Sequence, residues 1–426
     1  MPGTHPPKIA IVGSGPSGCY LAQSVLRGAP GAEITIIDRL ASPFGLIRYG
    51  VAADHQHTKA ITRQFDRLFR SGSVRFAGNV EIGRDLSLNE LRQLFDAVVL
   101  ATGLSADREL GVPGAELPGV IGAGVITRTL NAHPDEADEL PRLGSDPVII
   151  GGGNVAIDVL RFLVKDRAGF DASDVSDAAL DAYLAAPAER VTLVSRSGAA
   201  ASKGDPQMLR ELAALPRAVY FSPDDVSADP ASAPDRATAA RVAAISEMIS
   251  ADRAAHPGPQ VALRFGLSPV RVLGTDRVEG VEFASGDELL VVPATSVITA
   301  IGFAPLAAGH LAELLAEHSE IGRIEPGLYR TGWAKRGPRG AIPENRACAR
   351  SVADEILADL RDGSLTPSPE KPGFEGLPEP VRERAVDYDH WLALETHERE
   401  NAPKGRVRRK LSDHDLIVSV ARGTHD

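Results

Sequence analysis

The chain has 426 residues, 43% of them hydrophobic and 24% charged, which predicts two or three globular domains and excludes a disordered or coiled-coil chain. Its 57 acidic residues outnumber its 46 basic ones, and the resulting charge of -11 argues against general nucleic-acid binding. Only Cys19 and Cys348 are cysteines, and no apolar run is long enough for a membrane span, so we expect no metal centre, no membrane attachment and a cytoplasmic location.

The first predicted unit, over residues 8–39, has the order strand, glycine-rich turn, helix and strand, which is one βαβ unit of a parallel sheet. In its turn, Gly13 permits the tight bend, Gly15 lets the backbone approach a pyrophosphate and Gly18 allows the helix to pack closely. Asp38 ends the second strand, where a carboxylate accepts a hydrogen bond from a ribose 2′-hydroxyl and repels a 2′-phosphate. The pattern predicts FAD or NAD, and the alternative is a similar fold without a ligand. FAD is favoured because a second nucleotide site follows.

A second unit of the same kind is predicted over residues 147–194. Gly151 and Gly153 repeat the first two glycines of the turn, and Ala156 takes the third place. The strand that follows leads to Arg196 rather than to an acid, and an arginine in that place can pair with a 2′-phosphate. The pattern therefore predicts NADPH as the second ligand, and the alternative is an ordinary solvated arginine.

Two apolar runs, over residues 96–103 and 295–302, complete the pattern because each ends on small residues, as the strands of a parallel sheet do beside a nucleotide. The fold class that follows is α/β, with two doubly wound, Rossmann-like dinucleotide-binding domains.

Four motifs together resemble one family far more specifically than the glycine turns alone. They are Gly13-Ser-Gly-Pro-Ser-Gly18, Ser42-Pro-Phe-Gly-Leu-Ile-Arg-Tyr-Gly-Val51 with Asp54-His55, Gly153-Asn-Val-Ala-Ile-Asp158, and Gly332-Trp-Ala-Lys-Arg-Gly-Pro-Arg-Gly340. With these motifs the chain resembles the ferredoxin-NADP reductases of the adrenodoxin reductase type, over nearly its whole length.

The resemblance implies how the chain is divided and what it does. It implies an FAD-binding domain made of residues 1–103 and 332–426, with an NAD(P)-binding domain inserted at 104–331. It also implies an enzyme that transfers hydride from NADPH to FAD and then passes single electrons to a ferredoxin or a similar small iron-sulfur protein.

The same resemblance implies site residues. His55 and Glu211 would form a catalytic pair beside the nicotinamide, which can hold the carboxamide and relay a proton. Contacts to NADPH would come from Asn154, Val155 and Arg196. Contacts to FAD would come from Gly15, Asp38, Leu46, Val80, Trp333, Gly340 and Ile342.

Three departures from the family pattern affect the nucleotide side. Ser197 stands where the family commonly has a second arginine, and Met208 stands where it has a glutamate. The segment Ala201-Ser-Lys-Gly-Asp-Pro206 stands where the family commonly has one that contains phenylalanine and threonine. We therefore expect a modest preference for NADPH, with NADH as a possible second donor. Two other functions stay open: an NAD(P)H-dependent flavin reductase or diaphorase serving a quinone, a small organic acceptor or a specialised pathway, and a non-catalytic flavin-binding protein.

A basic run beside the fourth motif has two interpretations. Lys335, Arg336 and Arg339 would attract an acidic ferredoxin despite the negative charge of the whole chain, or they are ordinary solvated charges.

Overall fold

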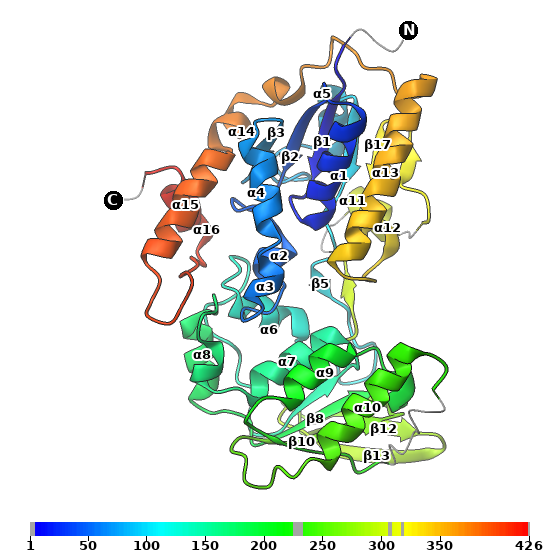
Figure 1. Ribbon diagram of the computed structural model, residues 1–426, viewed down its shortest axis with the longest axis vertical. Coiled ribbons are helices and arrows are strands. Elements are labelled where there is room, and N and C mark those ends of the chain that lie inside the picture. The colour runs from blue at the N-terminus through cyan, green and yellow to red at the C-terminus, as the bar shows by residue number, and fades with distance from the viewer. Residues whose placement is uncertain (1–4, 225–232, 306–308, 317–318, 425–426) are drawn as a thin grey trace.

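The computed structural model describes residues 5–224, 233–305, 309–316 and 319–424, and these form two lobes that follow one another along the long axis of the molecule (Figure 1). The first lobe is built on a six-stranded sheet with the order β16-β17-β4-β1-β2-β3. Its strand pairs are parallel except for β16 with β17. The strands are β1 (Lys8–Val12), β2 (Glu33–Ile37), β3 (Val74–Ala77), β4 (Ala97–Leu100), β16 (Arg323–Glu325) and β17 (Leu328–Arg330).

Helices cover both faces of this sheet, as buried parallel strands require. On one face α1 packs against α13 so closely that a Cβ added to Gly28 would lie 2.3 Å from Leu357 Cδ1. The helices of the first lobe are α1 (Pro16–Gly28), α2 (Leu46–Tyr49), α3 (Gln56–Lys59), α4 (Thr62–Arg70), α5 (Leu88–Leu94), α11 (Gly309–Ala316), α12 (Trp333–Arg336), α13 (Ile342–Asp362), α14 (Glu379–Arg384), α15 (Tyr388–Glu400) and α16 (His414–Ala421).

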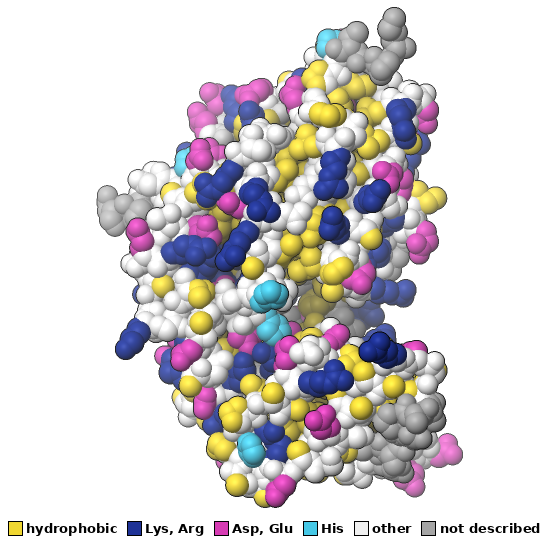
Figure 2. All heavy atoms as spheres, in the orientation of Figure 1, with side chains coloured by type: hydrophobic (Ala, Val, Ile, Leu, Met, Phe, Trp, Pro, Cys, Tyr) yellow, Lys and Arg dark blue, Asp and Glu magenta, His cyan; other side chains and the backbone are white. Residues whose placement is uncertain are grey.

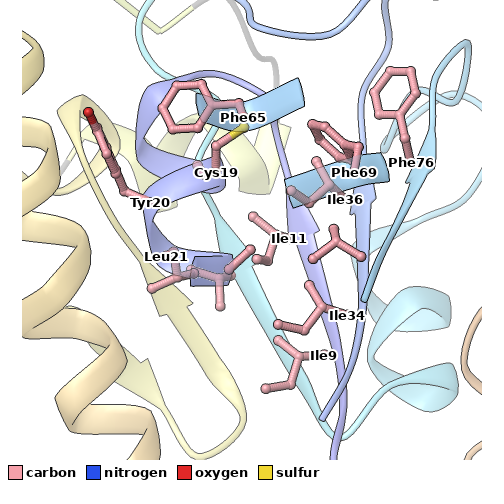
Figure 3. Close-up of a cluster of buried hydrophobic side chains, with 14 of the residues drawn as sticks. Ile9, Ile11, Cys19, Tyr20, Leu21, Ile34, Ile36, Phe65, Phe69 and Phe76 are labelled. Carbon is pink, nitrogen blue, oxygen red and sulfur yellow. The ribbon is translucent and has the colours of Figure 1, made fainter. Parts of the chain in front are cut away.

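The core of the first lobe lies between the sheet and these helices. Aliphatic side chains from alternate positions of β1 and β2 meet aromatic side chains of α4, and the period of two places all of them on one face. Figure 3 shows this cluster, which includes Ile9, Ile11, Ile34, Ile36, Phe65 and Phe69.

The second lobe repeats the architecture with a six-stranded, all-parallel sheet of order β6-β14-β7-β8-β10-β9. Its strands are β6 (Val120–Gly122), β7 (Pro147–Ile150), β8 (Arg190–Ser195), β9 (Val219–Phe221), β10 (Gln260–Phe265) and β14 (Ser296–Thr299). Its helices are α6 (Ala123–Leu130), α7 (Asn154–Val164), α8 (Asp177–Leu184), α9 (Pro206–Ala213) and α10 (Arg236–Ser250). An antiparallel sheet of β11 (Ser268–Leu273), β12 (Gly280–Ser285) and β13 (Glu288–Pro293) is added to it.

The chain crosses between the lobes through a short antiparallel pair, β5 (Ala106–Asp107) with β15 (Phe303–Ala304). The second lobe is therefore inserted into the first, and the expected fold class of two Rossmann-like domains is confirmed.

The chain returns to the first sheet before residue 332, where the resemblance places the domain boundary. Strand β17 pairs in parallel with β4, and β16 pairs with β17. Each of these strands has three residues, too few to show a periodic apolar pattern in the sequence.

Buried ion pairs join the C-terminal segment to both lobes. Asp174 of the second lobe receives Lys59 Nζ at 2.7 Å and Lys410 Nζ at 3.0 Å. Although burial opposes ionisation, these ammonium groups hold the pKa of Asp174 well below its usual range. Glu398 is fully buried and pairs with Arg48. Buried ion pairs thus join the two lobes, and removing one partner would leave an uncompensated buried charge that lowers the stability of the fold.

Among the helices that the structure describes, none combines the length and the apolar character that crossing a bilayer requires.

Candidate active site

The first glycine turn lies between β1 and α1, where the sequence pattern predicts it. Gly13 has φ +113°, and a Cβ added there would lie 2.4 Å from the carbonyl oxygen of Ala101. A Cβ on Gly18 would lie 2.1 Å from the carbonyl oxygen of Gly13. Gly15 caps the N-terminus of α1, and no atom lies within 4 Å of a Cβ added to it. The two outer glycines thus close the turn, and the middle one leaves an open cradle in front of free N–H groups, which fits a pyrophosphate.

Asp38 lies at the carboxyl end of β2, beside this cradle. Its Oδ2 accepts hydrogen bonds from Ser14 N at 2.8 Å and Ser14 Oγ at 2.5 Å, and its Oδ1 accepts from Leu40 N at 3.0 Å. The carboxylate is therefore fixed against the turn, where it suits a ribose with a free 2′-hydroxyl. These features fit the adenine dinucleotide of FAD.

Leu46 and Val80 are the next predicted flavin residues, and both lie close to the same turn. Leu46 begins α2 directly after Gly45, whose added Cβ would lie 3.1 Å from Gly15 Cα. Val80 is buried and donates its N–H to the carbonyl oxygen of Asp38 at 2.9 Å.

The predicted covering segment reaches this turn from far along the chain. A Cβ on Gly332 would lie 2.0 Å from Ser17 Oγ in the first turn of α1. Trp333 Nε1 donates to the carbonyl oxygen of Gly340 at 3.2 Å, and its ring stacks on Phe303 with centroids 5.6 Å apart. Ile342 begins α13 directly after this loop. Phe303 is a neighbour that the sequence does not indicate, since it lies on the connecting strand β15.

Two of the three basic side chains in the run beside Trp333 are not exposed. Lys335 is 4% exposed, because it lies on the inner side of α12. Arg336 donates to Asn345 Oδ1 at 2.5 Å and to the carbonyl oxygen of Arg339. The idea that Lys335 and Arg336 present free charges to a partner is therefore wrong, and of the three only Arg339 is exposed.

The second glycine turn, between β7 and α7, has the same geometry as the first. Gly151 has φ +143°, and a Cβ added there would lie 2.3 Å from the carbonyl oxygen of Ala300. Gly153 caps α7, and no atom lies within 4 Å of its added Cβ. Asn154 is exposed and accepts a hydrogen bond from Asp205 N at 2.8 Å, and Val155 is half-buried. The turn therefore fits a second pyrophosphate.

Arg196 directly follows β8, at the edge of the sheet where this turn lies. The side chain is exposed and makes no hydrogen bond or ion pair with any residue that the structure describes. Its guanidinium group is thus free to receive an anion.

The predicted pair of His55 and Glu211 is not formed among the described contacts. His55 lies at the start of α3, at the end of the first lobe nearest the second (Figure 1). Its Nδ1 lies 3.8 Å from Asp158 Oδ1, and its Nε2 contacts Arg161. Glu211 is exposed on α9, where it accepts a hydrogen bond from Gln207 Nε2 at 3.2 Å.

Asp158 is therefore the carboxylate partner of His55, and sequence reasoning missed it. Both Asp158 and Arg161 lie on α7, and Arg161 Nη1 donates to Asp158 Oδ1 at 3.1 Å. Burial raises the pKa of Asp158, although His55 and Arg161 act against this. The available signal was the position of Asp158 at the end of the Gly153-Asn-Val-Ala-Ile-Asp158 motif.

Figure 2 shows a hollow between the two lobes on the face that it presents, with histidine side chains beside it. Within the described part of the chain, no three His, Cys, Asp or Glu side chains lie close enough together to hold a metal ion.

Comparisons with known proteins agree with this geometry. Residues 7–214 match the family model described as pyridine nucleotide-disulphide oxidoreductase. The chain is 40% identical to cindoxin reductase of Citrobacter braakii, over 99% of this chain and 92% of that protein. It is 32% identical to NADPH:adrenodoxin oxidoreductase of Arabidopsis thaliana, over 98% and 96% of the two chains. It is also 32% identical to NADPH-ferredoxin reductase FprA of Mycobacterium leprae, over 98% and 99%.

A solved structure is similar along the whole chain. Mycobacterium tuberculosis FprA in complex with NADPH superposes with a TM-score of 0.90 and 28% identity, and the match covers 98% of this chain and 100% of that one.

Proposed function

The chain belongs to the family of NADPH-dependent adrenodoxin and ferredoxin reductases, and from this we propose that it oxidises NADPH through FAD and delivers electrons singly to a ferredoxin-like iron-sulfur protein. The observation that carries the proposal is the presence of two open glycine cradles, one beside the fixed carboxylate of Asp38 and one beside the free guanidinium of Arg196. The first suits a nucleotide without a 2′-phosphate, and the second suits one that carries it.

Bound FAD supplies the redox chemistry, since it accepts two electrons as hydride and releases them one at a time. In the first lobe, the N–H groups around Gly15 would bind the pyrophosphate, and the Asp38 carboxylate would accept a hydrogen bond from the adenosine ribose. The segment from Trp333 to Gly340, which the hydrogen bond between these two residues closes, would cover the flavin and shield it from water. We propose that this lobe, residues 1–103 with the chain from β16 onward, is the flavin domain, and that the inserted lobe binds NADPH.

His55 is the proposed proton-handling residue, at the junction of the two lobes. Arg161 of α7 contacts Nε2 of its ring and Asp158 of the same helix faces Nδ1 at 3.8 Å, so the surroundings of the imidazole depend on the second lobe. Glu211, on the next helix, stays a predicted second member of this site.

We also propose a cytoplasmic location. Cys19 and Cys348 are both buried free thiols, which is typical of proteins from a reducing compartment.

The test is the visible spectrum of the purified protein, followed by anaerobic addition of NADPH. We expect a flavin spectrum that bleaches with NADPH, and cytochrome c reduction that requires added ferredoxin. A flavin that NADPH cannot bleach would identify a non-catalytic flavin protein. Bleaching with rapid cytochrome c or quinone reduction in the absence of ferredoxin would favour a diaphorase.

A further inference from the structure

The NADPH side of the site has one cation fewer than its expected ligand calls for. A 2′-phosphate carries about two negative charges near neutral pH. Arg196 provides one positive charge, and the next residue is Ser197, which provides none. The missing charge has to come from elsewhere in the fold if NADPH is to be well distinguished from NADH.

The chain after Arg196 turns back toward the second glycine turn. A 3-10 turn over Ala199–Ala201 reverses its direction, and Ser202 Oγ donates to the carbonyl oxygen of Ala199 at 2.9 Å. Lys203 then donates its backbone N–H to the carbonyl oxygen of Gly152 at 3.0 Å. The return of the chain thus places Lys203 against the middle of the glycine turn.

Arg196 and Lys203 follow two residues that meet at the same glycine. A Cβ added to Gly152 would lie 2.6 Å from Ser195 Oγ and 3.7 Å from Ser202 Cβ. Since Arg196 directly follows Ser195 and Lys203 directly follows Ser202, the two cations leave the backbone on adjoining stretches of chain at one end of the sheet.

The loop that carries Lys203 is held in place from two sides. Arg241 of α10 donates to the carbonyl oxygens of Gly204 at 2.8 Å and Ala200 at 3.0 Å. On the other side, Asp205 N donates to Asn154 Oδ1 at 2.8 Å. This bracing limits the entropy that would be lost when the loop receives a ligand.

The ammonium group itself is free. Lys203 is exposed and its Nζ has no hydrogen bond or ion pair with any residue in the described ranges. The nearest acid along the loop, Asp205, is engaged at the start of α9, where its Oδ1 accepts from Gln207 N at 2.8 Å and from Met208 N at 3.3 Å.

We propose that Lys203 supplies the second positive charge for the 2′-phosphate of NADPH and is, with Arg196, a specificity-determining residue. The inference rests on the proposed function, and it assigns to Lys203 the charge that Ser197 lacks. Lysine binds phosphate as a point charge on a flexible stem, so it can reach the phosphate from the adjoining stretch of chain without the fork geometry of a second arginine.

The experiment measures binding of the adenosine half alone, so it does not depend on hydride transfer. Flavin-loaded wild-type and variant proteins are titrated with 2′,5′-ADP and with 5′-AMP in a calorimeter. Lys203→Ala is expected to weaken 2′,5′-ADP about tenfold and to change 5′-AMP less than about twofold. Lys203→Arg is expected to retain the affinity. The matched control is Lys404→Ala, which removes an exposed lysine beside Gly405, a residue that contacts Ala172 beyond the far end of α7.

A double variant that moves the second positive charge to a neighbouring position gives the sharpest test. Adding Ser197→Arg to Lys203→Ala is expected to restore most of the lost affinity, because it moves the second cation to the neighbouring position. A Lys203→Ala protein that binds 2′,5′-ADP as tightly as the Lys404→Ala control would overturn the role of Lys203 and leave the proposed function standing. A wild-type protein that binds 2′,5′-ADP no more tightly than 5′-AMP would overturn both.

Discussion

The two glycine turns have nearly the same backbone and very different surroundings. In each, the first glycine closes against a carbonyl oxygen of the neighbouring strand end, Ala101 in the first turn and Ala300 in the second. Around the first turn, Ser14 is fully buried and its backbone and hydroxyl are bound by Asp38. The second turn instead has an exposed Asn154 and free cations nearby. Two turns of one backbone geometry thus differ in exposure, and with the proposed ligands we expect the buried first turn to retain FAD and the exposed second turn to exchange NADPH.

The separate roles of the two turns are tested most directly by blocking each cradle in turn. Gly15→Val is expected to give protein without flavin, because the side chain fills the space of the pyrophosphate. Gly153→Val is expected to keep its flavin and to lose bleaching by NADPH at concentrations that saturate the wild type. The measurements are the flavin absorbance per protein and anaerobic stopped-flow spectra.

Both cradle glycines have room for a side chain, so the variants should fold. Gly31→Val is the control, since Gly31 is also open and lies outside either turn. Stoichiometric flavin in Gly15→Val would refute the assignment of the first turn.

The junction between the two turns gives the next largest effect. His55→Ala should slow flavin reduction about a hundredfold, which is typical for loss of an acid or base. Asp158→Asn should slow it about tenfold, because the variant keeps the shape and loses the charge that orients the imidazole. Glu211→Ala should have the smallest effect of the three, since Glu211 contacts Gln207 and not His55.

Stopped-flow reduction rates with bound flavin intact decide this order. If Glu211→Ala proves slower than Asp158→Asn, the partner of His55 changes when NADPH binds, and Asp158 is not the working carboxylate.

The third test measures the preference for NADPH over NADH, which we expect to depend on the residues around the second turn and not on those around the first. One charge-assisted contact contributes about 1.5 to 3 kcal/mol, or roughly ten- to a hundredfold in affinity. Arg196→Ala should therefore remove most of the preference for NADPH while scarcely changing NADH oxidation. Ser197→Arg should increase the preference. The ratio of kcat/KM values for the two donors measures both effects, and equal ratios in wild type and Arg196→Ala would make Arg196 an ordinary surface residue.

The smallest expected effect concerns the contact between the lobes. Arg39, next to Asp38, binds Asp135 of the second lobe, with Nη1 to Oδ1 at 3.0 Å. Nearby, burial lowers the pKa of His133 to about 4, and its Nδ1 accepts a hydrogen bond from Asp135 N at 3.1 Å. The unfolded chain takes up this proton near pH 6.5, whereas the folded chain does so only near pH 4.

Stability should therefore fall as the pH is lowered through this window. By pH 5.5 the loss attributable to His133 is about 1.4 kcal/mol, a factor of ten in the folding equilibrium. Urea unfolding of wild type and His133→Gln at pH 7.5 and 5.5 measures it. A variant with the same pH dependence as the wild type would show that His133 does not titrate in this way.

Local features of the site could be predicted from the sequence. Both glycine turns, Asp38 and Arg196 lie where the alternation of strand, turn and helix places them, since each depends on residues within one βαβ unit. Leu46 and Trp333 directly follow Gly45 and Gly332, which lie close to the first glycine turn and to α1, and their contacts to flavin stay a prediction.

Contacts between distant segments could not be predicted. The partner of His55 lies on a helix of the other lobe, and Lys335 is buried because α12 turns it inward. Strands β16 and β17 are too short to show a pattern and form only by pairing with β4. Lys203 lies in a segment that departs from the family pattern, and only the hydrogen bond from its backbone N–H to the carbonyl oxygen of Gly152 shows where this loop returns.

The pairing of β4 with β17 affects the order in which the two lobes fold while the chain is being synthesised. β4 pairs with β1 on one side and with β17 on the other. In the chain, the whole second lobe lies between β4 and β17. While the ribosome makes that lobe, β4 has an open edge, and such an edge invites pairing with other chains. The second lobe has its own complete sheet and can fold as it emerges. We therefore expect the second lobe to fold on the nascent chain before the first lobe, whose sheet closes only after β17 has been translated.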